Sequence, residues 1–337
     1  MINAALLHGA GYAGGELIAW LQHHPEISLR VVTSRTFAGK PVGAVHRKLV
    51  GQTDLCFSAP EAMDGMDIDL VFLAAEHGQA AQTVADLVAS GYAGRIVDLS
   101  ADFRFRDLSV YPAFFGYEHA FPALSAQFVY RLPEVSSPWD GTTRFIANPG
   151  CFATGITVAL APLVRQFGVT KACVTAVTGA SGSGQRPRET THYPTRDGNM
   201  RAYKVLSHQH TPEIEAALDG AVDVSFVPVS GPFTRGIWGT VTVDMPQGSR
   251  RSHVMDAYQS AYATGLVRVH PTGLPELGAV TYTPFVDVGL EAKGDTLVVV
   301  FALDNLLKGA ATQAIQNANE VLSLPTALGL IPLSTDS

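Results

Sequence analysis

The sequence predicts an α/β protein of two domains, the first of which contains a doubly wound sheet of parallel strands. The first half of the chain alternates short apolar runs with helical patterns, as parallel βαβ units do. The chain has 337 residues, enough for two cores, and its hydrophobic content of 47% is typical of a globular protein.

Strands and helices can be assigned in order along the first half. Apolar runs typical of strands occupy residues 4–8, 28–35, 69–76 and 95–100. One helical pattern follows the first strand up to about residue 24, and a second fills residues 79–90. This order predicts right-handed crossovers with helices on both faces of the sheet.

Composition limits the partners of the protein. The formal net charge of −7 disfavours nonspecific binding to nucleic acid or to an anionic membrane. No apolar run approaches the roughly 20 residues of a membrane helix, and the N-terminus lacks the basic start of a signal peptide. Three cysteines do not make a disulfide framework. We therefore expect a cytoplasmic protein that acts on a small molecule, without a nucleic-acid or membrane partner.

A glycine-rich motif follows the first strand. Gly9, Gly11 and Gly14 form the pattern G-x-G-x-x-G between a strand and a helix, with Tyr12 and Ala13 inside it. Glycines permit a tight turn, and the N–H groups at a helix N-terminus bind a pyrophosphate. The motif predicts a dinucleotide site, and the alternative is a glycine-rich turn that binds no ligand.

The end of the second strand predicts which dinucleotide binds. An NAD site usually carries an acidic residue there, which binds the ribose 2′-hydroxyl. This strand ends instead with Ser34 and Arg35, and Lys40 follows. A hydroxyl and cations suit a 2′-phosphate, so we predict NADP(H) rather than NAD. Arg35 could alternatively be a solvated surface charge.

A cysteine lies where a turn meets a helical pattern. Residues 148–151 read Asn-Pro-Gly-Cys, and apolar positions at helical spacing follow. The free N–H groups and the positive dipole end of a helix start favour a thiolate, so Cys151 is predicted to be a nucleophile toward an acyl group. Cys173, within a strand pattern, is predicted to be a small buried residue, and Cys56 has no evident partner.

Two histidines precede a helix start. His208 and His210 lead into Thr211-Pro212-Glu213, which predicts Thr211 as the N-cap and proline at the first helical position. Histidines on such a loop can line a pocket and exchange protons with a nucleophile. The cysteines and histidines do not have the spacing of a zinc site, so we predict no metal.

Two further loops follow strands. Residues 177–189 contain Ser181 and Gly182, followed by Arg186 and Arg188, and could bring N–H groups and cations to an anion or form a mobile surface loop. Arg104 follows the strand at 95–100, at the edge where open α/β sheets bind ligands.

Together these segments resemble the N-acetyl-γ-glutamyl-phosphate reductases of arginine biosynthesis, in the semialdehyde dehydrogenase superfamily. The similarity extends over almost the whole chain, in the same order and with similar spacing. It rests on GYAGGEL (11–17), HPEISL (24–29), TSRTFAGKP (33–41), DLSADFR (98–104), LPE (132–134), NPGCFAT (148–154), SGSG (181–184), HQHTPEIE (208–215), RGI (235–237) and DNLLKGAATQAIQNAN (304–319).

The resemblance implies a fold and an activity. An NADP-binding Rossmann domain (1–149) would be completed by a C-terminal helix (305–337), and residues 150–304 would form an α+β catalytic and substrate-binding domain with a mixed or antiparallel sheet. The implied reaction is NADPH-dependent reduction of N-acetyl-γ-glutamyl phosphate to N-acetyl-glutamate 5-semialdehyde through a cysteine thioester. A homo-oligomer, either a dimer or a tetramer, is also implied.

The resemblance also assigns roles to residues. It implies Cys151 as the nucleophile and His208 as the acid/base, with His210 as its competitor. The implied substrate-binding residues are Arg104, Asn148, His210, Glu213 and Arg235. The implied cofactor-binding residues are Gly9, Gly11, Tyr12, Ala13, Gly14, Ser34, Arg35, Ser181, Gly182, Asn305 and Gly309.

Three positions depart from the family pattern. His8 and Arg131 stand where glycines are usual, and Gln185 takes the place of an arginine, with Arg186 next to it.

Two other activities stay open. One is a related semialdehyde dehydrogenase acting on aspartyl or aminoadipyl phosphate, since one methylene is worth only about 1–3 kcal/mol in recognition. The other is a cysteine hydrolase or acyltransferase that uses no NADP.

Overall fold

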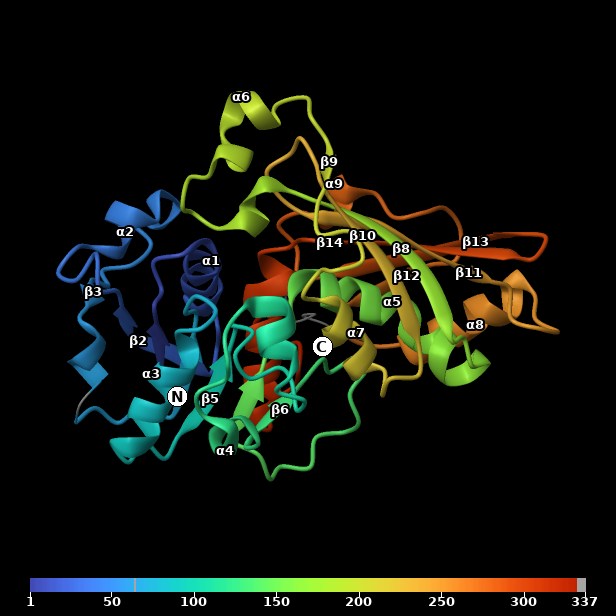
Figure 1. Ribbon diagram of the computed structural model, residues 1–337. Helices are drawn as coiled ribbons and strands as arrows, with labels where there is room; N and C mark the ends of the chain where they lie inside the picture. The colour runs from blue at the N-terminus through green and yellow to red at the C-terminus, as the bar shows by residue number, and fades with distance from the viewer. Residues whose placement is uncertain (64, 332–337) are drawn as a thin grey trace, which may run out of the picture.

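The computed structural model describes residues 1–63 and 65–331, which form two sheets of seven strands each (Figure 1). In the first sheet the order is β3-β2-β1-β4-β5-β7-β6 and all neighbouring strands are parallel, which confirms the predicted doubly wound fold. Its strands are β1 (Ile2–Leu7), β2 (Ile27–Thr33), β3 (Phe57–Ser58), β4 (Leu70–Leu73), β5 (Arg95–Asp98), β6 (Phe128–Tyr130) and β7 (Phe145–Ala147).

Helices cover both faces of this sheet because successive residues of a strand point to opposite sides. Ala4 and Leu6 of β1 pack in one cluster with α1 (Tyr12–Leu21) and α10 (Thr312–Val321). Ala5 and Leu7 pack in another with α3 (Ala80–Ala89). The end of the chain thus returns to the first sheet, as the red segment at the junction of the two halves shows in Figure 1.

The second sheet is mixed, as the resemblance implied. Its order is β12-β13-β14-β11-β8-β10-β9, with parallel pairing in β8–β10 and β12–β13 and antiparallel pairing elsewhere. Its strands are β8 (Lys171–Thr178), β9 (Arg201–Ala202), β10 (Asp223–Ser230), β11 (Ile237–Asp244), β12 (Val267–His270), β13 (Val286–Lys293) and β14 (Thr296–Leu303).

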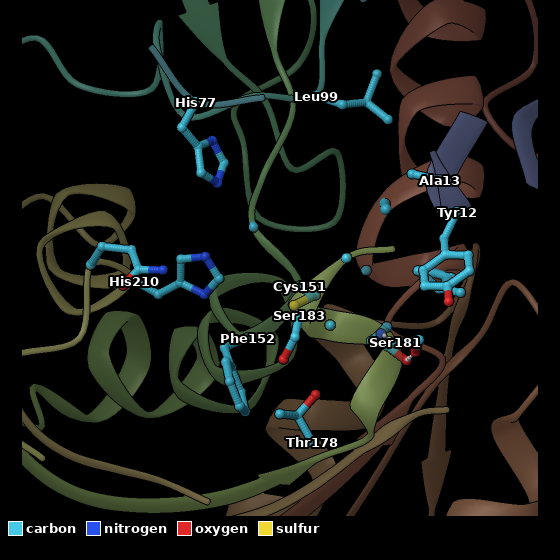
Figure 2. Close-up of a pocket in the computed structure, with 18 of the residues that line it drawn as sticks. Tyr12, Ala13, His77, Leu99, Cys151, Phe152, Thr178, Ser181, Ser183 and His210 are labelled. Carbon is cyan, nitrogen blue, oxygen red and sulfur yellow. Dashed lines mark hydrogen bonds between the residues drawn. The ribbon is translucent and has the colours of Figure 1, made fainter. Parts of the chain in front are cut away.

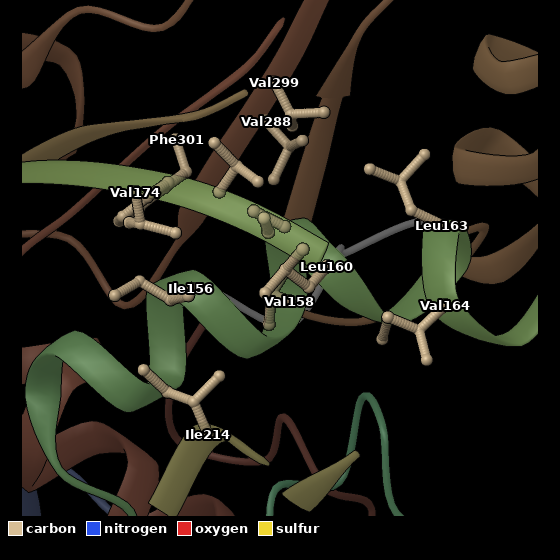
Figure 3. Close-up of a cluster of buried hydrophobic side chains, with 14 of the residues drawn as sticks. Ile156, Val158, Leu160, Leu163, Val164, Val174, Ile214, Val288, Val299 and Phe301 are labelled. Atoms are coloured by element: carbon tan, nitrogen blue, oxygen red, sulfur yellow. The ribbon is translucent and has the colours of Figure 1, made fainter. Parts of the chain in front are cut away.

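One face of the second sheet packs on the long buried helix α5 (Cys151–Phe167), flanked by α7 (Thr211–Ala217) and α8 (Arg251–Ala261) (Figure 3). In β8, Ala172 and Val174 face this core, so Cys173 faces the opposite side and is exposed. The prediction that Cys173 is buried was therefore wrong, because strand periodicity alone does not say which face is covered.

Short elements join these layers. They are α2 (Val42–Val45), η1 (Arg47–Leu49), η2 (Pro60–Met63), η3 (Tyr111–Phe115), α4 (Pro122–Ser125), η4 (Ala180–Ser183), η5 (Glu189–Thr191), α6 (Tyr193–Arg196), α9 (Leu277–Val280) and η6 (Leu307–Ala311).

The C-terminal helix differs from the prediction. A π-helical turn, η6, precedes α10, which ends at Val321, and residues 332–337 lie outside the described part of the chain. Helix α10 is buried on nearly all sides. Its polar residues bond within the protein instead of facing water. Asn317, for example, donates to Asn148 Oδ1 at 2.9 Å and to the Arg131 carbonyl at 3.1 Å.

Candidate active site

A cavity of about 540 Å³ lies where residues of the two sheets meet. Strands β1, β4, β5 and β7 all end near it, since Gly11, Ala74, Leu99 and Asn148 line it and each closely follows one of them. Strand order reverses direction between β1 and β4, and open α/β sheets bind ligands at such a switch point. The topology therefore places the cavity where a dinucleotide would bind.

Some glycines of the motif line the cavity, and others allow the turn to pack closely. Gly11, Tyr12, Ala13 and Gly14 line the cavity, and a side chain at Gly11 would meet no atom within 4 Å. Gly9 is not among the lining residues. The Gly9 N–H donates to the Thr33 carbonyl at 3.0 Å, and a Cβ on Gly14 would lie 2.3 Å from the Gly9 carbonyl oxygen. Gly9 therefore supports the packing of the turn. It was expected to bind the cofactor, but it does not line the cavity.

His8 adopts the backbone conformation that its family counterpart, a glycine, would favour. Its φ is +59°, in the left-handed region that other residues seldom adopt. Its Nε2 lies 3.5 Å from Thr83 Oγ1, on α3. A non-glycine residue in this conformation carries some backbone strain.

Ser34 and Arg35 follow β2 directly, on the same edge of the sheet as the glycine turn. Ser34 is buried and its hydroxyl accepts the Phe37 N–H at 3.3 Å, while Arg35 is exposed. Neither residue is among those lining the Cys151 cavity. Their role in binding a 2′-phosphate stays a prediction.

Cys151 is the first residue of α5, with Gly150 as N-cap, which confirms the predicted helix start. Its expected ionisation is not observed. Burial raises the pKa of its thiol to about 11 and outweighs the opposing effects of the Phe152 N–H and the Arg104 charge. The thiol is therefore protonated at neutral pH in this structure. The helix terminus weakens this effect of burial without reversing it.

His208 and His210 are both buried and line the same cavity as Cys151 (Figure 2 labels His210). Burial lowers the pKa of His208 to about 2, and the pKa of His210 also falls well below its usual value. The His210 N–H donates to Nδ1 of His208 at 3.1 Å, so the neutral His208 ring carries its proton on Nε2. His208 is thus a proton donor at that nitrogen.

The helix after these histidines begins one residue earlier than predicted. His210 is its N-cap, and Thr211 is already helical, with Pro212 next to it. The Thr211 hydroxyl is buried and has no hydrogen-bond partner among the described residues. The capping prediction was wrong, because His210 is the N-cap and no side chain makes a capping hydrogen bond.

Arg104 lines the cavity, and three of its N–H groups donate within the protein. Nη1 donates to Glu213 Oε2 at 3.0 Å, Nε to the Asn148 carbonyl at 2.9 Å and Nη2 to the Leu99 carbonyl at 3.0 Å. Glu213 Oε1 in turn accepts the Gly150 N–H at 2.7 Å. The pair holds the turn that carries Cys151, so the expectation that Arg104 and Glu213 contact substrate is not supported by these bonds.

Arg235 is not among the residues that line the Cys151 cavity. Its Nε donates to Asp304 at 2.5 Å and its Nη1 to Glu16 at 2.6 Å. Arg235 was expected to bind substrate, but it forms buried ion pairs that join α1 to the second sheet. Two carboxylates distant in the sequence hold this side chain away from the cysteine.

The structure brings together Ser181, Gly182, Asn305 and Gly309, all of which line the cavity. Asn305 Nδ2 donates to Ser181 Oγ at 3.0 Å, and its Oδ1 accepts the Gly236 N–H at 2.6 Å. A Cβ on Gly309 would lie 2.6 Å from the Cβ of Cys151. These residues, predicted to contact the cofactor, therefore surround the cysteine.

Sequence reasoning missed several residues that line this cavity. They are His77, Arg188, Arg196, Arg201, Tyr203 and Lys204. Arg188 was noted only as part of a loop. The run Arg-Ala-Tyr-Lys at 201–204 contains two cations beside an aromatic residue, a signal that was available but ambiguous.

Two searches of the described residues bear on other functions. No group of three or more histidine, cysteine, aspartate or glutamate side chains there could hold a metal ion. None of the helices described is long and apolar enough to span a membrane.

Family models match both halves of the chain. Residues 3–138 match the NAD binding domain of semialdehyde dehydrogenase, and residues 151–305 match the semialdehyde dehydrogenase dimerisation domain. With its dinucleotide-type turn and cysteine in one cavity, the chain is an oxidoreductase of the semialdehyde dehydrogenase class.

Curated relatives narrow this class. The chain is 37% identical to the N-acetyl-gamma-glutamyl-phosphate reductase of Methanothrix thermoacetophila and 40% identical to that of Methanopyrus kandleri, with 98% of each chain covered. It is 38% identical to that of Nitrosomonas eutropha, with 99% of both chains covered. The chain belongs to the N-acetyl-γ-glutamyl-phosphate reductase family.

Solved structures share the fold at lower identity. Aspartate semialdehyde dehydrogenase II of Vibrio cholerae, complexed with ASA, matches with a TM-score of 0.74 at 17% identity, over 96% of this chain and 98% of that one. The Candida albicans enzyme with NADP matches with a TM-score of 0.69 at 16% identity, over 96% and 98%. These likenesses describe the fold alone.

Proposed function

We propose that this protein reduces N-acetyl-γ-glutamyl phosphate to N-acetyl-glutamate 5-semialdehyde and phosphate, with NADPH as reductant. The name shared by relatives 37–40% identical over almost the whole chain supports this substrate. The observation that carries the proposal is that Cys151 and the glycine turn Gly11–Gly14 line one cavity. A nucleophile for an acyl group thus lies beside a dinucleotide-type turn.

NADPH, when bound, supplies the hydride. The residues fit such a group, since Gly11 faces open space at the start of α1 and no side chain caps the N–H groups there. We propose that Gly11, Tyr12, Ala13 and Gly14 hold the pyrophosphate. Ser181, Gly182, Asn305 and Gly309 would contact the nicotinamide end, and Ser34 and Arg35 the 2′-phosphate.

The proposed first step forms a thioester on Cys151. Its sulfur bonds to the acyl carbon, the carbon–oxygen bond to phosphate breaks, and the thiol proton leaves with the phosphate. Because the thiol is neutral at pH 7, it does not repel the anionic substrate as that substrate approaches. The N–H groups at the start of α5 are placed to stabilise the oxyanion, an effect of about 3–4 kcal/mol per donor elsewhere.

His208 would act in the second step. While the thioester carbon is reduced, Nε2–H of His208 would donate a hydrogen bond to its oxygen and stabilise the oxyanion. The electron pair of that oxygen re-forms the carbonyl as the carbon–sulfur bond breaks, the aldehyde leaves, and the released thiolate takes a proton from water. One such donor to an oxyanion is typically worth about 10²–10³-fold in rate.

The reverse reaction tests the proposal. The protein is incubated with N-acetyl-glutamate 5-semialdehyde, phosphate and NADP, and absorbance of NADPH is followed. Aspartate and aminoadipate semialdehydes serve as comparators, and Cys151→Ser should lose nearly all turnover while NADPH fluorescence still reports binding. Preference for another semialdehyde would refute the substrate. Turnover by Cys151→Ser would refute the thioester, and a protein that does not bind NADPH would favour the cysteine hydrolase.

The cofactor preference has its own test. Arg35→Asp should raise the KM for NADP at least about tenfold more than the KM for NAD, because it replaces a cation near a 2′-phosphate with an anion. Steady-state kinetics with both dinucleotides measure the ratio. Equal changes in the two constants would remove Arg35 from the proposed site.

We also propose that the chain assembles as a homo-oligomer in the cytoplasm. The family model for residues 151–305 is described as a dimerisation domain, and the face of the second sheet opposite α5 exposes Cys173 and Thr175. A second copy could cover this face. The proposed chemistry needs a reduced thiol, which a reducing cytoplasm maintains.

A further inference from the structure

Four cations line the Cys151 cavity without an acidic partner. Arg188, Arg196, Arg201 and Lys204 all come from the segment 184–206, which crosses above the junction of the two halves in Figure 1. Within residues 1–63 and 65–331, none of these four lies within 4.0 Å of a carboxylate oxygen. Arg104 and Arg235, in contrast, are both paired with carboxylates. The unpaired positive charge of the cavity therefore lies on this segment.

Arg196 is the most constrained of the four. Its Nη2 donates to the Thr178 carbonyl at 3.2 Å, which orients the guanidinium at the end of β8. Its Nε is buried and has no hydrogen-bond partner in the described part of the chain. Arg196 itself lines the cavity, so N–H groups at the end of its guanidinium can donate to an anion there.

Arg201 lines the same cavity as Arg196. Burial lowers the pKa of Arg196, and the Arg201 charge lowers it further, so the two charges repel. Arg201 is placed by the short edge strand β9, where it pairs with Ser230 of β10. Two guanidinium groups that line one cavity without a carboxylate partner among the described residues suit a doubly charged anion.

The pair lines the same cavity as the reacting sulfur. Tyr203 lines it as well, and both Tyr203 and Cys151 pack against the core of the second sheet. Figure 2 shows Thr178, which Arg196 contacts, on the opposite side of Cys151 from His77. Lys204 differs from the arginines, because its Nζ donates to Gln209 Oε1 at 2.9 Å.

We propose that Arg196 and Arg201 bind the phosphoryl group of the acyl-phosphate substrate, and inorganic phosphate in the reverse direction. The inference rests on the proposed function, in that the substrate is an acyl phosphate. Two planar guanidinium forks match the charge and the oxygens of a phosphate dianion. They take the role that the sequence had suggested for Arg104 and Arg235.

The arginine pair can stabilise the phosphate as it leaves. As the sulfur–carbon bond forms, the carbon–oxygen bond breaks and its electron pair stays on the phosphate, which then takes the thiol proton. Cations beside that oxygen stabilise the developing charge. In reverse, a phosphate oxygen attacks the thioester carbon and the sulfur leaves, so the same pair orients the nucleophile.

Binding of inorganic phosphate to the full-length protein saturated with NADP tests the proposal directly. Calorimetry is done at constant ionic strength, with chloride replacing phosphate, because screening alone weakens charged contacts. Arg196→Gln and Arg201→Gln should each weaken phosphate binding roughly tenfold or more, since each removes a charge-assisted fork. Arg250→Gln, at the exposed start of α8, is the matched control and should bind as the unaltered protein does.

Reverse kinetics then separate the phosphate from the rest of the substrate. Each variant should raise the KM for phosphate roughly tenfold or more, while the semialdehyde KM and NADPH binding stay within about twofold. Unchanged phosphate binding in both variants would overturn the proposal, and so would a rise in the semialdehyde KM alone. If Arg196→Gln fails to fold, the exposed Arg201 still provides the test.

The result is independent of the proposed substrate. Phosphate binding by Arg196 and Arg201 does not depend on which semialdehyde the enzyme accepts. A protein that binds phosphate through this pair but does not oxidise N-acetyl-glutamate 5-semialdehyde would refute the proposed function and leave the phosphate site intact.

Discussion

Burial determines the protonation of the side chains around Cys151. The pKa of its thiol is raised to about 11, and that of His208 is lowered to about 2, so both groups are neutral at pH 7. An ion pair between cysteine and histidine is therefore not preformed. We infer that proton transfer accompanies bond formation, and that the phosphate-binding arginines supply the positive charge that neutral histidines do not.

The two histidines should differ in their effect on turnover. His208→Asn should lower kcat about a hundredfold with NADPH affinity unchanged, because Nε2–H of His208 donates a hydrogen bond to the oxyanion. His210→Asn should have a smaller effect, since a side chain on Gly150 would meet Nε2 of His210 at 2.4 Å, so this nitrogen faces the turn. Steady-state and single-turnover rates measure both. A larger loss in His210→Asn would assign the donor to the other ring.

Asp98 should make stability depend on pH. It is fully buried at the end of β5, and burial raises its pKa to about 7, with neighbouring Asp102 adding to the shift. The pKa of Asp98 is higher in the folded protein than in the unfolded chain, so the folded state binds more protons between about pH 4 and pH 7. The free energy of unfolding therefore falls as the pH rises through this range. Asp98→Asn removes this dependence.

The expected gain of Asp98→Asn is larger at high pH. The variant should raise the free energy of unfolding by about 2 kcal/mol more at pH 8.5 than at pH 5.5, at 1.36 kcal/mol per pKa unit. Urea unfolding at the two pH values measures the difference. An equal effect at both would mean that Asp98 is ionised in the folded protein throughout this range.

At the scale of elements, the π-helical turn η6 positions the C-terminal segment against Cys151. The Gly309 N–H donates to the Asp304 carbonyl at 2.9 Å, five residues earlier. Lys308 is completely buried and donates to Glu134 at 2.6 Å and to Gln316 at 2.5 Å. Single π-turns often occur at functional sites, and this buried network holds the turn in place.

Gly309→Ala should disable the site, because its Cβ would lie 2.6 Å from the Cβ of Cys151. We expect kcat to fall at least about a hundredfold, since even a 1 Å displacement can cost that much. Gly278→Ala is the matched control, as its Cβ would meet no atom within 4 Å. Turnover and circular dichroism of both variants separate lost activity from lost folding. Full activity of Gly309→Ala would show that the turn adapts.

Arg131, which replaces a common glycine, ties β6 to α10. Nε and Nη2 donate to the two oxygens of Glu320 at 2.9 and 2.5 Å, and the guanidinium lies 5.2 Å from the Trp139 ring centroid. This bidentate pair adds a second attachment of the last helix beside the Asn317–Asn148 bond. The arginine at this position therefore holds α10 in place and does not line the cavity.

At the scale of the whole molecule, the two sheets depend on each other for the site. The first sheet supplies the glycine turn and the strand that leads to Cys151, and the second supplies the loop with the unpaired cations. The division at residues 149 and 150 stays a prediction. It falls between β7 and α5, immediately before the cysteine.

The oligomer should depend on the face of the second sheet opposite α5. Thr175→Glu places a charge on that face, beside Thr240 of β11, and should shift sedimentation toward the monomer. Ser109→Glu, at an exposed position in the first half, is the control and should leave the mass unchanged. A monomeric unaltered protein, or an oligomer insensitive to Thr175→Glu, would contradict this interface.

The sequence by itself determined the local features of this protein. Periodicity revealed the strands and helices of the first half, glycines marked the turn, and the Asn-Pro-Gly-Cys run marked the start of α5. These follow from interactions between residues close in the chain, so spacing alone reveals them.

Only the tertiary structure decided which charges are free and which groups are ionised. Arg235 is paired with residues 69 and 219 positions away, and the Cys151 thiol is neutral because distant segments bury it. Burial and ion pairing depend on neighbours that spacing does not reveal. The tertiary structure pairs Arg104 and Arg235 with carboxylates and leaves Arg196 and Arg201 without such a partner among the described residues.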